Sequence, residues 1–220
     1  MGVDPASLVD LAPLIVVDHP VVADRLAQLR DRDTDNFAFR RLTSELSAFV
    51  AYEALRDLET ETITVETPVA SDTDARRISE TLLLVPILRA GLGMVPAIIS
   101  MLSPVEVAHV GLRRDEETLA STLYLDALPA SLTGRRVVVC DPMLATGGTL
   151  VQVCDLIAGR GATSIVVLCL LASMPGLRRF RDAHPDVLVA CAGIDPVLND
   201  SGYIVPGLGD AGDRLFGRPG

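Results

Sequence analysis

Lysine is missing from this chain of 220 residues, and all 19 of its basic residues are arginine. Schiff-base enzymes, pyridoxal phosphate enzymes and nucleotide-binding proteins with a Walker loop each need a lysine. The absence excludes all three classes. A phosphate group must therefore be bound by backbone N–H groups or by arginine, whose planar guanidinium can donate to two oxygens at once.

Cysteine and histidine are scarce and scattered. No pair among the four cysteines has the CxxC spacing of a metal site, and they lie in apolar runs, at positions 140, 154, 169 and 191. We expect them to be small core residues of a reduced protein. The three histidines, at positions 19, 109 and 184, are expected to serve packing or capping. No catalytic triad and no protein-bound metal are expected.

Long apolar runs and an excess of basic residues are also missing. Without about eighteen consecutive apolar residues the chain is not expected to cross a membrane. Its first residues do not combine a basic region with an apolar core, so no signal peptide is expected and a cytoplasmic location is predicted. The formal net charge of −10 argues against a large nucleic-acid interface, because phosphate backbones attract a basic surface.

The length fits one domain over residues 1–220, since neither an internal repeat nor a flexible linker divides the chain. Residues 1–16 look like a loose N-terminal extension. Asp18 is expected to cap a helix with Pro20 in its first turn. A second helix and a strand should follow, at Asn36–Leu58 and Thr62–Val69.

Short apolar runs then alternate with helical patterns. The predicted strands are Thr81–Pro86, Val105–Leu112, Arg135–Asp141, Ser164–Leu171 and Val187–Ala192. The predicted helices between them are Gly93–Leu102, Thr149–Arg160 and Pro175–Ala183. This alternation predicts an α/β fold with a central, mainly parallel sheet flanked by helices, which binds ligands outside the carboxyl ends of its strands.

The most informative segment joins a buried strand to a helix. The apolar run Val137–Cys140 ends in Asp141, and Ala-Thr-Gly-Gly-Thr at 145–149 opens the next helix. Glycine lets a phosphate approach the free N–H groups of a helix start, and a carboxylate can accept hydrogen bonds from sugar hydroxyls. An ordinary strand-to-helix turn is the alternative, but the combination favours a site for ribose 5-phosphate. The predicted contacts are Asp141, Pro142, Met143, Leu144, Ala145, Thr146, Gly147, Gly148 and Thr149.

Three other segments could complete such a site. Arg89 and Ala-Gly-Leu-Gly follow an apolar strand, so Arg89 is either a surface residue in a turn or a clamp for pyrophosphate. The charged run Arg113–Thr118 would, by itself, be read as a solvated surface. The glycine-rich stretch 195–217 is too long for an idle loop and is predicted to cover a binding site.

These segments resemble the uracil phosphoribosyltransferases, which are type I phosphoribosyltransferases. The resemblance covers about residues 17–217. It is carried by Asp-Pro-Met-Leu-Ala-Thr-Gly-Gly at 141–148 and by Tyr-Ile-Val-Pro-Gly-Leu-Gly-Asp-Ala-Gly-Asp at 203–213. Arg113 and Asp115 depart from the family's pattern. The resemblance implies the type I phosphoribosyltransferase fold, with residues 195–217 as a base-binding segment, here called the C-terminal hood.

The implied reaction converts uracil and 5-phospho-α-D-ribose 1-diphosphate (PRPP) to UMP and diphosphate. Arg89 and Arg114 would bind the pyrophosphate of PRPP, and Asp141 and Asp210 would be the catalytic residues, with Asp210 also touching PRPP. Uracil would contact Ile204, Gly209, Asp210 and Ala211. A non-proline cis peptide is expected within Leu88–Gly91.

The resemblance also implies Mg²⁺ bound mainly through PRPP, a homodimer or larger homo-oligomer, and GTP as a candidate activator. Two alternative functions stay open. One is a phosphoribosyltransferase for another base. The other is a regulator with the same fold that senses PRPP and binds RNA.

Overall fold

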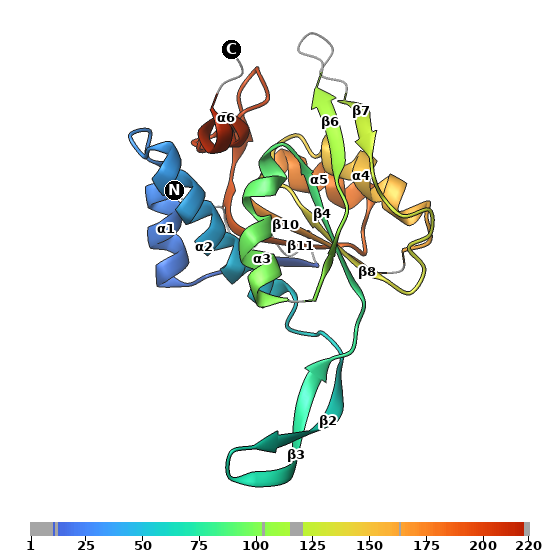
Figure 1. The fold of residues 1–220 in the computed structure, drawn as a ribbon. Coiled ribbons are helices and arrows are strands. Elements are labelled where there is room, and N and C mark those ends of the chain that lie inside the picture. Colours follow the sequence, from blue (N-terminus) through green and yellow to red (C-terminus); the bar gives the residue numbers. More distant parts are fainter. Residues whose placement is uncertain (1–10, 12, 103, 115–120, 163, 218–220) are drawn as a thin grey trace.

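The computed structural model describes residues 11, 13–102, 104–114, 121–162 and 164–217. A central sheet crosses the molecule (Figure 1). In spatial order its main strands are β1 (Leu14–Val16), β11 (Leu188–Asp195), β10 (Ser164–Ser173), β8 (Arg136–Cys140), β4 (Leu82–Leu88), β6 (Val110–Arg114) and β7 (Ser121–Asp126). Neighbouring strands are parallel except β6 and β7. Short strands β5 (Glu106–Val107) and β9 (Met143–Leu144) add to β4 and β10. The parallel arrangement brings the predicted binding loops to one edge of the sheet.

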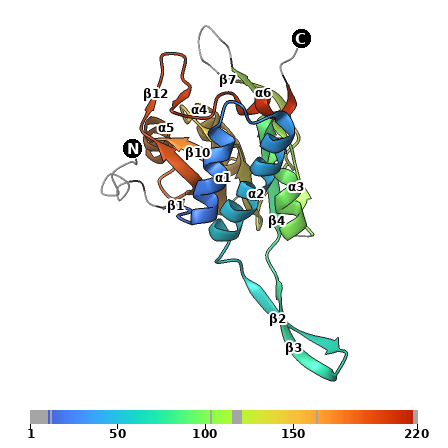
Figure 2. The same cartoon turned by 90° about the vertical axis from the view of Figure 1, so that its left-hand side faces the viewer.

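Helices cover both faces of this sheet (Figures 1 and 2). One face carries α1 (Pro20–Arg30), α2 (Asn36–Ala54), α3 (Val95–Met101) and α6 (Ala211–Phe216), and the other carries α4 (Gly148–Ala158) and α5 (Met174–Ala183). Strand β4 is apolar because both of its faces are covered. Leu82 and Leu84 pack in the core on the side of α1, α2, α3 and α6, whereas Leu83 and Val85 pack in the core on the side of α4 and α5. The fold is thus an α/β sandwich of three layers, as the resemblance to the type I phosphoribosyltransferases implies.

The N-terminal third differs in detail from the sequence prediction. His19, not Asp18, caps α1, because its Nδ1 accepts a hydrogen bond from the backbone N–H of Val21 at 3.1 Å. Helix α2 ends at Ala54 rather than Leu58. Residues 14–16, expected to be part of a loose extension, form β1 at the edge of the sheet, and a three-residue strand is too short to show periodicity.

A hairpin projects from the body (Figures 1 and 2). It consists of β2 (Thr60–Thr67) and β3 (Ala70–Ile78), which pair as a two-stranded sheet of their own. The sequence predicted one strand here, at Thr62–Val69, and missed β3. Most side chains of β3 are exposed, so no apolar alternation marks it. The run predicted as one strand over Val105–Leu112 is divided between β5 and β6.

The four cysteines are buried and unbridged, as predicted. Burial raises the pKa of the Cys154 thiol to about 12, so this group stays protonated and inert. Within the described part of the chain, no helix is long and apolar enough to cross a membrane.

Candidate active site

A cavity of about 860 Å³ joins segments that are distant in the sequence. Its lining includes Ala90, next to Arg89. It also includes Asp141, Met143 and Ala145 from the predicted phosphate loop, which is the segment Asp141–Thr149. The C-terminal hood supplies the rest, namely Asp200, Ser201, Gly202, Tyr203, Ile204, Gly209, Asp210, Ala211 and Gly212. The fold therefore brings together three of the four segments that the sequence singled out, and most of the fourth, Arg113–Thr118, lies outside the described residues.

The predicted phosphate loop lies between β8 and α4. Gly147 has a left-handed backbone (φ 76°), and a side chain there would lie 2.7 Å from the carbonyl oxygen of Gly176. Glycine is therefore required both by the turn and by the close approach of α5. Helix α4 begins at Gly148, so its first N–H groups have no partner within the helix and can bind an anion.

Asp141 occupies the carboxyl end of β8 and is partly buried in the cavity wall. Burial raises the pKa of its carboxyl group to about 7, opposed by a hydrogen bond of 3.2 Å from the backbone N–H of Met143. Water stabilises the ionised form less here than at an exposed site. The carboxylate is thus prepared for a ligand that supplies hydroxyl donors or positive charge.

Helix α5 supports the phosphate loop from behind. The Ser173 hydroxyl donates to the carbonyl oxygen of Ala145 at 2.6 Å and accepts from the N–H of Gly176 at 2.9 Å. A side chain at Gly176 would clash with the same Ala145 carbonyl. Sequence reasoning missed both residues, although a serine followed by Met-Pro is a helix-cap pattern.

Arg89 follows β4 at the same edge of the sheet and precedes the short helix η2 (Ala90–Gly93). The peptide between Leu88 and Arg89 is cis, as expected from the family resemblance. The Arg89 guanidinium lies 3.4 Å from a carboxylate oxygen of Asp213 in α6. A side chain at Gly91 would clash with the carbonyl of Cys140, so this loop passes directly over β8.

The C-terminal hood folds into a hairpin and a helix. Strands β12 (Val197–Leu198) and β13 (Ile204–Val205) are antiparallel, and the side-chain oxygen of Asn199 accepts from two N–H groups of their turn. Asp210 caps α6 by accepting from the N–H of Asp213 at 2.8 Å. The side chains of Ile204 and Ala211 are buried, and Gly209 has none. All three predicted uracil contacts therefore offer a ligand little side-chain surface, and their backbone groups are the polar atoms available to it.

A buried ion pair holds the middle of the hood. Asp195 accepts from both terminal nitrogens of Arg30 at 2.7 Å and from the N–H of Gly207 at 2.8 Å. Arg30 also donates to the carbonyl of Gly207 at 2.8 Å. Arg214 donates to the carbonyls of Leu208 and Leu29. Sequence reasoning missed these contacts, because partners far apart along the chain leave no local pattern.

Arg114 ends β6, but its side chain and residues 115–120 lie outside the described part of the structure. Its predicted contact with pyrophosphate stays a prediction. Carboxylates of Asp141, Asp200 and Asp210 line the cavity. Within the described residues, no three His, Cys, Asp or Glu side chains gather to hold a metal ion. The carboxylate oxygens that line the cavity suit an Mg²⁺ ion that is held chiefly by a phosphate ligand.

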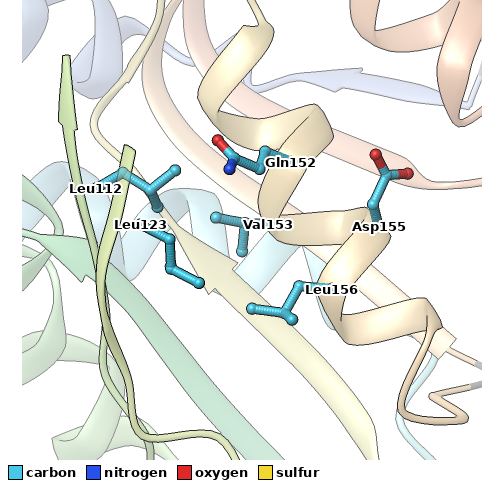
Figure 3. Close-up of a pocket in the computed structure, with 6 residues that line it drawn as sticks. All are labelled: Leu112, Leu123, Gln152, Val153, Asp155 and Leu156. Atoms are coloured by element: carbon cyan, nitrogen blue, oxygen red, sulfur yellow. The ribbon is translucent and has the colours of Figure 1, made fainter. Parts of the chain in front are cut away.

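A second cavity of about 310 Å³ lies between α4 and the β6–β7 hairpin (Figure 3). Its lining is mainly apolar, with Leu112, Leu123, Gln152, Val153, Asp155 and Leu156. A carboxylate oxygen of Asp155 lies 3.2 Å from the Nε2 atom of His184, which directly follows α5. One carboxylate among leucines and valine does not make a catalytic centre, so the larger cavity is the candidate active site.

Comparison with known proteins gives a consistent result. The family model described as uracil phosphoribosyltransferase matches residues 16–218. A uracil phosphoribosyltransferase from Kineococcus radiotolerans is 51% identical over 207 residues, which are 93% of this chain and 98% of that protein. The structure of the AQ2163 protein from Aquifex aeolicus is similar, with a TM-score of 0.88, 34% identity and coverage of 93% and 98% of the two chains. A hypoxanthine-guanine phosphoribosyltransferase from Bacillus anthracis shares the fold at 16% identity and a TM-score of 0.50, over 73% and 80% of the chains.

Proposed function

Because the chain belongs to the uracil phosphoribosyltransferase family, we propose that it transfers the phosphoribosyl group of PRPP to uracil, forming UMP and diphosphate. The observation that carries this proposal is the single cavity of about 860 Å³, in which the phosphate loop, the Arg89 loop and the C-terminal hood meet. One such cavity can hold PRPP and a base in contact.

The phosphoribosyl end of PRPP is assigned to the loop from Asp141 to Thr149. The backbone N–H groups of Thr146–Thr149 bind the 5′-phosphate at the start of α4. Asp141 accepts hydrogen bonds from the ribose hydroxyls. The raised pKa of its carboxyl group, about 7, is expected to fall when those donors arrive.

The pyrophosphate end is assigned to Arg89 and Arg114, which can each donate to two oxygens. Mg²⁺ would be held mainly by PRPP and would neutralise charge on the diphosphate, and Asp210 is the residue that would orient a water bound to the ion. The hood presents the backbone of Ile204, Gly209 and Ala211 to the edge of uracil. The family resemblance assigns Asp210 to the junction of base and PRPP, where it would orient the base or a magnesium-bound water.

The reaction needs no protein nucleophile. The bond from C1 of the ribose to the pyrophosphate oxygen breaks as the base nitrogen forms its bond to C1. The proton of the base nitrogen passes to water, and the electron pair of the broken C1–O bond leaves with diphosphate. Positive charge develops on the ribose, and Asp141 stabilises it, while the arginines stabilise the leaving group.

A panel of bases tests the substrate assignment. With PRPP and Mg²⁺, uracil should form UMP, and hypoxanthine, adenine and orotate should react at least ~100-fold less well by kcat/KM, because a mismatched base leaves buried polar groups unpaired. Equal rates with a purine would favour the alternative of another base. RNA binding without any transferase activity would favour the regulatory alternative.

The family resemblance also supports finer proposals. These are a homodimer or larger homo-oligomer, activation by GTP, a cytoplasmic location and a single domain over residues 1–220. The hairpin β2–β3, which projects from the body, offers a surface to a second copy of the chain. Sedimentation with and without GTP, combined with rate measurements, tests the first two: a monomer whose rate ignores GTP contradicts both.

A further inference from the structure

Arg179 lies against the phosphate loop, although no sequence motif points to it. Gly176 and Arg179 are three residues apart on α5 and share the face that packs on this loop. A Cβ atom added to Gly148 would lie 3.3 Å from Nη2 of Arg179 and 3.4 Å from both Cζ and Nη1. Three nearly equal distances mean that the flat face of the guanidinium covers the backbone of Gly148, at the first turn of α4.

The positive charge of Arg179 is available to a ligand. Its side chain is exposed, and no hydrogen bond or ion pair joins it to any other residue that the structure describes. This is notable in a chain with 29 acidic and 19 basic residues. The phosphate loop itself, from Asp141 to Thr149, contains no basic residue. A dianionic phosphate at this loop would otherwise meet only backbone N–H groups and hydroxyls.

We propose that Arg179 is a further substrate-binding residue, which donates hydrogen bonds to the 5′-phosphate of PRPP and UMP. The inference rests on the proposed function, because it takes the start of α4 as the 5′-phosphate site. With the face of the guanidinium on Gly148, its N–H edges remain available to an anion at the same helix end.

The support from α5 makes this contact favourable. Ser173 and Gly176 hold α5 against Ala145, so the backbone that carries Arg179 is fixed relative to the phosphate loop. Anion binding then costs less conformational entropy than it would for an arginine on a free loop. The glycine at position 148 is explained as well, since a side chain there would displace the guanidinium.

The test compares Arg179→Gln with Arg178→Gln. Arg178 is also exposed and on α5, and it has no described ion pair, so it controls for the loss of one positive charge. Binding of UMP, ribose 5-phosphate and inorganic pyrophosphate is measured by calorimetry. We expect Arg179→Gln to weaken UMP and ribose 5-phosphate about tenfold, or about 1.4 kcal/mol, and to leave pyrophosphate unchanged. Arg178→Gln should change none of the three.

Arg179→Lys is a second variant that keeps the charge and should lose less affinity than Arg179→Gln. Unchanged affinity of Arg179→Gln for ribose 5-phosphate would overturn the inference. So would equal losses in the Arg178 and Arg179 variants, which would indicate a general charge effect. A wild-type protein that binds neither UMP nor ribose 5-phosphate would instead refute the proposed function.

Discussion

At the scale of single residues, Asp141 meets two opposing requirements. Its proposed role in catalysis calls for an ionised carboxylate beside the ribose, whereas its partly buried position favours the protonated form and raises its pKa to about 7. The folded protein therefore keeps a proton on this group up to about pH 7, and the unfolded chain releases it near pH 4. The stabilisation that the folded state gains from holding this proton is complete below pH 4 and is lost as the pH rises through about 7.

We therefore expect Asp141→Asn to be more stable than the wild type at pH 8, by up to about 4 kcal/mol, with little difference at pH 4. Urea unfolding at the two pH values measures this. In the same variant, kcat should fall more than PRPP affinity, because the charge matters most when the ribose becomes positive. A loss of PRPP binding with a normal kcat at saturation would make Asp141 a ground-state anchor only.

Arg89 is the second residue whose role can be isolated. Its contact with Asp213 is 3.4 Å long, and about half of its side chain is exposed, so this contact contributes little to stability. Arg89→Ala should leave the melting temperature nearly unchanged. It should lower kcat/KM for PRPP. The expected loss of transition-state stabilisation is about 3–4 kcal/mol, as for other fixed donors that stabilise developing charge. Near-normal kcat/KM would remove Arg89 from the pyrophosphate site.

At the scale of elements, α5 and the phosphate loop form one rigid unit. Gly176→Ala would place a methyl group against the Ala145 carbonyl and push the two apart. We expect a loss of about 1–3 kcal/mol in stability and weaker PRPP binding. Gly159→Ala is the matched control, because Gly159 has an ordinary helical backbone and its nearest contact would be 3.2 Å. Equal effects of the two substitutions on PRPP binding would argue against the rigid unit.

The ion pair of Asp195 with Arg30 connects β11, α1 and the hood. Asp195→Asn removes the charge that holds Arg30 and weakens the hold on Gly207, three residues before Asp210. Breaking a fully buried pair costs about 3–5 kcal/mol, and because a quarter of the Arg30 side chain is exposed we expect a loss at the lower end of that range. We also expect the KM for uracil to rise severalfold while the Kd of PRPP stays within about twofold, since the pair touches the hood and not the phosphate loop. Steady-state kinetics and calorimetry separate the two, and equal changes in both constants would count against a role in positioning the base.

At the scale of the whole molecule, the parallel sheet decides where chemistry is possible. Strands β4 and β8 are adjacent and parallel, so Arg89 and Asp141 emerge at the same edge. The hood then closes over that edge from the far end of the chain, and the β12–β13 turn, Ile204 of β13 and the start of α6 supply the remaining wall. The tight passages at Gly91 and Gly147 show that these loops tolerate no extra atoms.

The sequence by itself determined the α/β class, the strands that carry the site, and the phosphate loop. In each case, apolar runs, glycines and a terminal acid are close together in the chain, and local sterics suffice. Only the tertiary structure revealed Ser173, Gly176 and Arg179 behind that loop, and the ion pair that joins Arg30 to Asp195 of the hood. It also revealed β3 and β7, whose exposed side chains lack an apolar period. These features depend on contacts between distant segments, and such contacts exist only once the hydrophobic core has brought the segments together.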